Sequence, residues 1–410
     1  MAGGGGDGKG WIGFLVGGGA LVGGAMGAEA AAVAVPEWAI GALLGLGGLL
    51  VVFGSCEAMI KGVEGAAARL DMNEFVAGTM AGLASNVPEL VMLGFVIAAA
   101  PRVGFIVTLL TLHVGAAAFG IYSGVLPRDA TGHARLPAPL VKLSTDLYAC
   151  AAGVFFATGA IMVLMNVFDA GDYRGEALGA VDLYVIAAFL LVVEVVAVVR
   201  LVKRFSSSEE LPSESRDSDA DGSPATAPWA TKDAANEKEK PEPASWGTIA
   251  FYGALGIGTS VIGGHAVGDF ADILVSGLSA AGYSEMIGAL ILSVFAAAGA
   301  FVMIISAHLK GMYDIALASA SGQVNQVPFV VLPVVLILLG VFGQTGVIEL
   351  TPHGGVLPID LETTSVVFLA FPSFLILWKA VQDDGAVNWV ETVTMVAIFG
   401  LVIYFLAAHG

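Results

Sequence analysis

The stretch Ala84–Phe95, ASNVPELVMLGF, places an asparagine, a proline and a glutamate inside a segment otherwise apolar enough to cross a membrane. A carboxylate at the centre of a bilayer costs about 2.5–3.5 kcal/mol even on lenient insertion scales, so such a group usually faces a cavity, a cation or a proton path. Glu89 lies about midway along its apolar segment. The sequence therefore predicts that the carboxylate of Glu89 has a function that explains the free-energy cost of placing it in the membrane.

The composition indicates a membrane protein. Of the 410 residues, 57% are hydrophobic and 13% are charged, and the mean hydropathy is +0.86, which no soluble globular protein of this size needs. Apolar runs of about 20 residues recur along nearly the whole chain, and the 55 glycines suit closely packed helices. Barrel strands would be shorter and would alternate in polarity. We expect an all-α polytopic membrane protein.

The charge and the cysteines narrow the function classes. A formal net charge of −18 excludes a nucleic-acid footprint, which needs clustered basic residues. Cys56 and Cys150 stand in apolar surroundings, where we expect two buried thiols, although a pair between them stays open. No cofactor is indicated, and the expected partner is the lipid bilayer.

A polar segment divides the membrane part in two. Residues 205–246 are rich in Ser, Pro, Ala and acidic residues, so they predict a disordered linker. Residues 1–35 form an N-terminal extra helix or a signal-like segment, since apolar residues follow Lys9 and small residues stand near its end. The remaining parts, 36–204 and 247–410, each hold five apolar segments. An odd number per half reverses the second half in the membrane, which predicts two inverted five-helix repeats.

Pro88 gives the carboxylate segment its second unusual feature. Proline lacks a backbone donor, so it frees the carbonyl of Ala84 and predicts a break or kink in the helix. Ser85 and Asn86 add two side-chain oxygens within one turn of Glu89. Such hard oxygen ligands suit Ca²⁺ or Na⁺. The alternative is a proline kink with Glu89 paired to a neighbouring helix.

These residues resemble a known family. The stretch VAGTMAGLASNVPELV (76–91) is similar to the first α-repeat of the calcium/cation antiporter superfamily, which includes the sodium/calcium exchangers. The family pattern there is a helix that runs into G-T-S-x-P-E, and Pro88 and Glu89 match its end. The resemblance implies ion binding by Ala84, Ser85, Asn86 and Glu89.

The second half resembles the second α-repeat over residues 284–326, with Asp314 among the matches. It departs from the pattern at FAAAGA (295–300), where Gly299 replaces the proline and marks a second expected helix break, and Ala300 replaces the second glutamate. Asn325 and Gln326 could repopulate this second site. The resemblance implies a metal site of Glu89 with Asp314.

Two further polar residues are candidate ion ligands. His113 stands where the family places an ion-site asparagine, and its alternative is a hydrogen-bonded core histidine. Asp269, one turn after His265, could replace the lost acid of the second repeat, and its alternative is an outward-facing helix end. Asp314 could also simply cap the start of a helix.

The resemblance implies a secondary active antiporter in the cell membrane. Its expected cargo is Ca²⁺, exchanged against Na⁺ or H⁺ by alternating access. The alternative is a transporter-derived ion-binding or regulatory membrane protein that has lost exchange. An enzyme is not expected, because no H-E-x-x-H or G-x-S-x-G motif is present. Protein partners stay open.

The basic residues predict the orientation of the chain. Lys and Arg concentrate in alternate loops, including the linker, which therefore lies in the cytoplasm. Single cysteines introduced into 206–245 should react with an impermeant thiol reagent only after the cells are opened. Labelling of this segment from outside intact cells would contradict the topology.

Overall fold

The structure is a computed structural model. It describes residues 10–70, 72, 74–126, 128, 132–136, 138–167, 177–205, 244–309, 313–351, 354–383 and 385–409. The predicted linker, 205–246, lies outside these residues except at its two ends.

Long helices make up nearly all of the described chain. Before the linker these are α1 (Gly10–Ala30), α2 (Glu37–Arg69), α3 (Glu74–Ala99), α4 (Pro101–Val125), α5 (Ala138–Val167) and α6 (Ala180–Phe205). After it follow α8 (Trp246–Ala280), α9 (Glu285–Leu309), α10 (Tyr313–Gln326), the π-helix η1 (Val327–Val331), α11 (Leu332–Thr345), α12 (Leu361–Asp383) and α13 (Trp389–His409). Within the described residues, ten helical segments are long and apolar enough to cross a membrane, with α10, η1 and α11 joined in one of them. In α9, the stretch Glu285–Ala297 is a shorter apolar helix.

The expected all-α fold of two inverted five-helix repeats is confirmed. The first repeat is α2–α6, and in the second α8, α9, α10 to α11, α12 and α13 take the corresponding places. Two short antiparallel strand pairs follow the same inversion. β1 (Ala134–Arg135), between α4 and α5, pairs with β4 (Ala386–Val387), between α12 and α13. β2 (Ala177–Leu178), between α5 and α6, pairs with β3 (Leu357–Pro358), between α11 and α12. The two strand pairs are therefore equivalent to each other when the repeats are exchanged.

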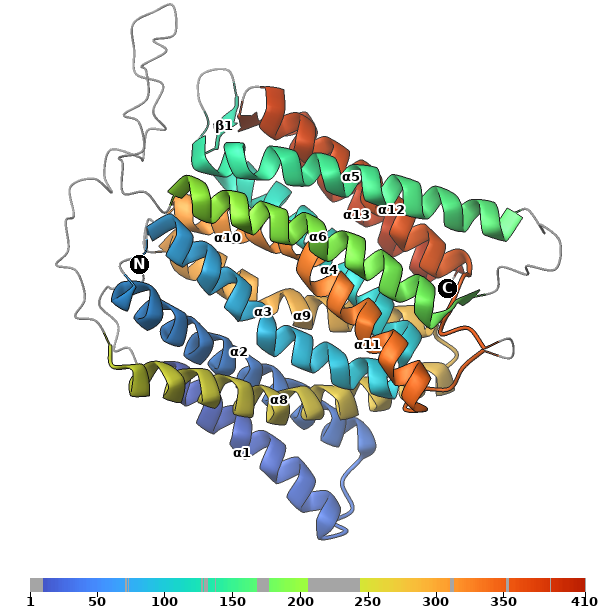
Figure 1. Cartoon of the computed structure of the whole chain (residues 1–410). Coiled ribbons are helices and arrows are strands. Elements are labelled where there is room, and N and C mark those ends of the chain that lie inside the picture. Colours follow the sequence, from blue (N-terminus) through green and yellow to red (C-terminus); the bar gives the residue numbers. More distant parts are fainter. Residues whose placement is uncertain are drawn as a thin grey trace, which may run out of the picture.

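The helices form layers, shown in Figure 1. At one edge α1, α2 and α8 lie side by side, and at the other α5 packs against α12. Glycines let the first layer pack closely: a Cβ on Gly48 would lie 2.9 Å from the carbonyl oxygen of Gly263. Close backbone approach of this kind is typical of membrane helices, in which small residues line the contacts.

α4 forms the centre of the molecule. Nearly all of its residues are buried, and it contacts α9, α10, α12 and α13. Its two threonines keep their polar atoms satisfied within the helix, since Thr108 and Thr111 donate to the carbonyls of Gly104 and Val107. Cys56 is half-buried, whereas Cys150 is exposed, so the prediction that Cys150 is buried was wrong.

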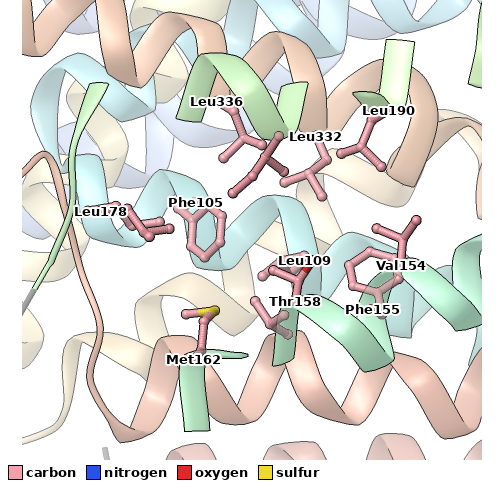
Figure 2. A pocket seen from close by; sticks show the side chains of 13 residues that line it. Phe105, Leu109, Val154, Phe155, Thr158, Met162, Leu178, Leu190, Leu332 and Leu336 are labelled. Carbon is pink, nitrogen blue, oxygen red and sulfur yellow. The ribbon is translucent and has the colours of Figure 1, made fainter. Parts of the chain in front are cut away.

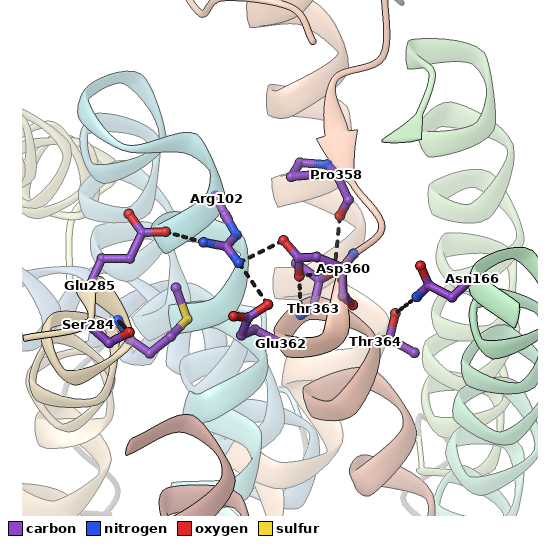
Figure 3. A network of polar contacts seen from close by, with 10 residues as sticks. Arg102, Asn166, Ser284, Glu285, Pro358, Asp360, Glu362, Thr363 and Thr364 are labelled. Carbon is purple, nitrogen blue, oxygen red and sulfur yellow. Dashed lines mark hydrogen bonds and ion pairs between the residues drawn. The ribbon is translucent and has the colours of Figure 1, made fainter. Parts of the chain in front are cut away.

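Arginines join the two halves at both ends of α4. We call the face at which α6 ends and α8 begins the linker face. There Arg128 donates to the carbonyl of Val387 (3.2 Å) and lies 4.0 Å above the ring of Trp389. At the opposite face, Arg102 contacts three carboxylates, which we call the Arg102 node (Figure 3). They are Glu285 on α9, Asp360 (2.7 Å), and Glu362 on α12 (3.0 Å).

We predict that Arg102→Gln lowers the thermal stability far more than Glu285→Gln does. The first change leaves three neighbouring carboxylates without their cation, whereas the second leaves Arg102 with two. With partly exposed side chains, the cost of Arg102→Gln should be roughly 1–3 kcal/mol. Thermal unfolding in detergent measures both variants, and equal losses would contradict this account of the node.

Candidate cation site

α3 carries the candidate site and is helical from Glu74 to Ala99 with Pro88 inside it. The expected helix break is therefore absent at Pro88, and Gly299 likewise lies within the continuous helix α9. A single proline removes one backbone donor, a loss that membrane helices tolerate. The carbonyl of Ala84 still lacks the N–H that a residue other than proline would supply.

The hydroxyl of Ser85 turns back to its own helix. It donates to the carbonyl oxygen of Gly82 over 2.7 Å. The carbonyl of Ser85 in turn accepts a weak hydrogen bond from Cys56 Sγ on α2, at 3.5 Å. In this structure, Ser85 therefore connects α3 to α2 through its backbone, and its side chain is engaged locally.

Asn86 joins the first half of the chain to the second. Its Nδ2 donates to Oε1 of Gln326, the last residue of α10, over 2.9 Å. Asn86 is buried. Gly82 leaves room for the Gln326 amide, because a Cβ at Gly82 would lie 3.0 Å from its Nε2. With Nδ2 engaged, Oδ1 of Asn86 is the atom left to bind a cation.

Glu89 lies three residues beyond Asn86 along α3. Its Oε1 is buried and has no hydrogen-bond partner among the described residues. Buried polar atoms nearly always have a partner, so a carboxylate oxygen without one is the group best suited to receive a cation or a proton. Glu89, Asn86 and Gln326 form what we call the amide–carboxylate site.

An irregular turn follows Gln326. The chain passes from α10 into the π-helix Val327–Val331, which contains Pro328, and then into α11. Short π-helical turns are rare and frequently occur at functional sites. Sequence reasoning missed this turn, although Pro328, two residues after Gln326, was a signal for it. The irregular backbone of the site thus lies in the second half, not at Pro88.

His113 is directed toward a different helix. It is 1% exposed, and its Nε2 lies 3.1 Å from the carbonyl oxygen of Val366 on α12. Its Nδ1 is buried without a partner among the described residues. The structure therefore ties His113 to α12, and neither ring nitrogen is hydrogen-bonded to Asn86 or Gln326.

The two other candidate acids lie on α10 and α8. Asp314 is the second residue of α10, and twelve residues of helix place it ~18 Å before Gln326 along the axis; its side chain lies outside the described part. Asp269 on α8 is about half exposed and pairs with His265 over 2.9 Å. The expected Glu89–Asp314 pair involves a side chain outside the described part, and it stays a prediction.

Comparison with known proteins matches the second half of the chain to a protein family. A model of the sodium/calcium exchanger protein family matches residues 249–408. The fold is similar to that of an H⁺/Ca²⁺ exchanger, CAX, with a TM-score of 0.60 and 11% identity over 98% of this chain and 92% of that one. Residues 249–408 thus match the sodium/calcium exchanger protein family, and the fold of the described chain is similar to that of a solved cation exchanger.

A second solved structure agrees on the fold. The Ca²⁺/H⁺ antiporter protein YfkE gives a TM-score of 0.59 at 15% identity, over 96% of this chain and 98% of that one. No curated protein sequence matches the chain. The family match and the ten apolar helical segments within the described residues indicate a multi-pass membrane protein.

We predict that Asn86→Ala and Gln326→Ala are not additive in their effect on stability. Each substitution removes the same hydrogen bond, so the double variant should lose about 0.5–1.5 kcal/mol less than the sum of the single variants. Chemical or thermal unfolding of the four proteins completes the cycle. Additive losses would show that the two amides do not interact.

Proposed function

We propose that this antiporter exchanges Ca²⁺ against Na⁺ or H⁺ by alternating access, with Glu89 supplying the negative charge for the cation. The observation that carries the proposal is the buried Oε1 of Glu89, which lacks a partner in the described structure. It lies within one turn of an amide bridge that joins α3 to α10. Exchange requires a site between the two halves, and this bridge lies at their contact.

The site offers oxygen ligands for a hard cation. Ca²⁺ takes six to eight oxygens, including carboxylate, amide, backbone and water oxygens. The carboxylate of Glu89, Oδ1 of Asn86 and the free carbonyl of Ala84 supply protein ligands of these kinds, and water would complete the shell. We place the protein in the cell membrane with its linker in the cytoplasm, as the basic loops indicate.

Both coupling ions remain part of the proposal. The solved structures with the same fold include an H⁺/Ca²⁺ exchanger and a Ca²⁺/H⁺ antiporter protein, which supports H⁺. The family model is that of sodium/calcium exchangers, which supports Na⁺. Uptake of ⁴⁵Ca²⁺ into proteoliposomes under an imposed Na⁺ or pH gradient separates them, because only the coupled gradient drives accumulation against a Ca²⁺ gradient.

One observation favours the second function, ion binding without exchange. Ala300 stands where the family carries a second glutamate, and Ala297, one turn earlier, is fully buried. The second repeat therefore contributes an apolar helix at this level. If neither gradient drives uptake while ⁴⁵Ca²⁺ still binds the purified protein, ion binding without exchange is the function.

We predict that Glu89→Gln abolishes gradient-driven ⁴⁵Ca²⁺ uptake while the protein stays folded and inserted. The amide has nearly the shape of the carboxylate but lacks its charge. Glu194→Gln is the matched control, because it removes another carboxylate within a membrane helix, α6, which supplies no residue to the amide–carboxylate site. Uptake by Glu89→Gln at the rate of the unmodified protein would exclude Glu89 as the ligand.

A further inference from the structure

A second buried polar cluster lies between α5 and α10. It consists of Ser144 and Tyr148 on α5 and of Ser321 and Asn325 on α10, and we call it the hydroxyl cluster. These side chains are 1%, 0%, 1% and 7% exposed. The hydroxyl of Tyr148 lies 2.7 Å from Ser321 Oγ, which lies 3.0 Å from Ser144 Oγ. Asn325 Nδ2 donates to Ser144 Oγ over 3.1 Å.

The hydroxyl cluster holds the same turn of α10 that carries Gln326. Asn325 and Gln326 are neighbours in the chain, and consecutive helical residues point about 100° apart. Asn325 therefore faces Ser144 on α5, whereas Gln326 faces Asn86 on α3. The last turn of α10 is thus bonded from two sides, immediately before the backbone changes to the π-helix.

A purely structural contact between α5 and α10 would not need these groups. Apolar side chains of similar size would join the helices without burying three hydroxyls and an amide. Oδ1 of Asn325 is buried without a partner among the described residues, so the amide is not fully satisfied. Buried directional bonds do fix the orientation of the groups beside them, and here the neighbouring group belongs to the amide–carboxylate site.

We propose that Tyr148 is a positioning residue for cation binding. Its hydroxyl fixes Ser321 and, through the hydroxyl cluster, the last turn of α10, so that Gln326 holds Nδ2 of Asn86 and leaves Oδ1 directed to the cation. The proposal rests on the proposed function of the amide–carboxylate site. Tyr148 itself contacts no ligand, and its effect is on the affinity of the site.

The test compares Tyr148→Phe with Tyr184→Phe. Tyr184 on α6 also donates a hydrogen bond from its hydroxyl, to Gln344 Oε1 over 3.0 Å, but this bond lies at the exposed rim between α6 and α11. In ⁴⁵Ca²⁺ uptake, Tyr148→Phe should raise KM roughly three- to tenfold, as expected for loss of one hydrogen bond, with Vmax changed less than about twofold. Tyr184→Phe should leave both parameters unchanged.

Two further measurements keep the outcome decisive. If Tyr148→Phe does not fold, Ser144→Ala, which removes a smaller hydroxyl group of the same cluster, should give the same rise in KM. An unchanged KM in a folded variant would overturn the positioning role. If Glu89→Gln abolishes uptake while Tyr148→Phe leaves KM unchanged, only the positioning role is wrong; if Glu89→Gln transports normally, the site itself is wrong.

Discussion

The hydrogen bond between Asn86 and Gln326 is the contact on which the candidate site depends. It joins residues 240 positions apart in the chain and ties the carboxylate helix α3 to the second repeat. Without it, the carboxylate of Glu89 would stand on one helix of one repeat, with no ligand group from the other. A buried amide bridge also resists rearrangement, because each partner would leave a polar group unpaired if they separated.

Among the described residues, polar contacts between the two repeats concentrate around α4 and are fewer in the α1–α2–α8 layer. α4 is joined to the second repeat by Arg102 and Arg128, and both strand pairs link the repeats outside the α1–α2–α8 layer. That layer is held mainly by glycine contacts and by the Ser55–Thr259 hydrogen bond within it. A small apolar cavity of about 30 Å³ lies between Phe105, Leu190 and Leu336 (Figure 2), and its lining holds no charged side chain.

Sequence reasoning predicts what depends on local pattern. The apolar runs predicted the helices, and the odd number of helices in each half predicted the inversion. The motif predicted that Asn86 and Glu89 lie on one helix. The break at Pro88 failed because one missing hydrogen bond is too small a loss to interrupt a long apolar helix. The partner of Asn86 and the hydroxyl cluster depend on the rotation of α10 between α3 and α5, which no local pattern encodes.

The single negative charge of the proposed site limits which cation it can bind favourably. Ala300 supplies no carboxylate, and Asp314 lies ~18 Å before Gln326 along α10. Asp269 and its partner His265 both lie on α8. In the proposed site, Glu89 is then the described carboxylate that a bound ion would meet. One Na⁺ or one proton would leave the site neutral, whereas one Ca²⁺ would leave a positive charge that neutral oxygens and water must solvate at low dielectric. Because that solvation comes from Asn86, the backbone at Ala84 and water, the orientation of the Asn86 amide matters most for a divalent cargo.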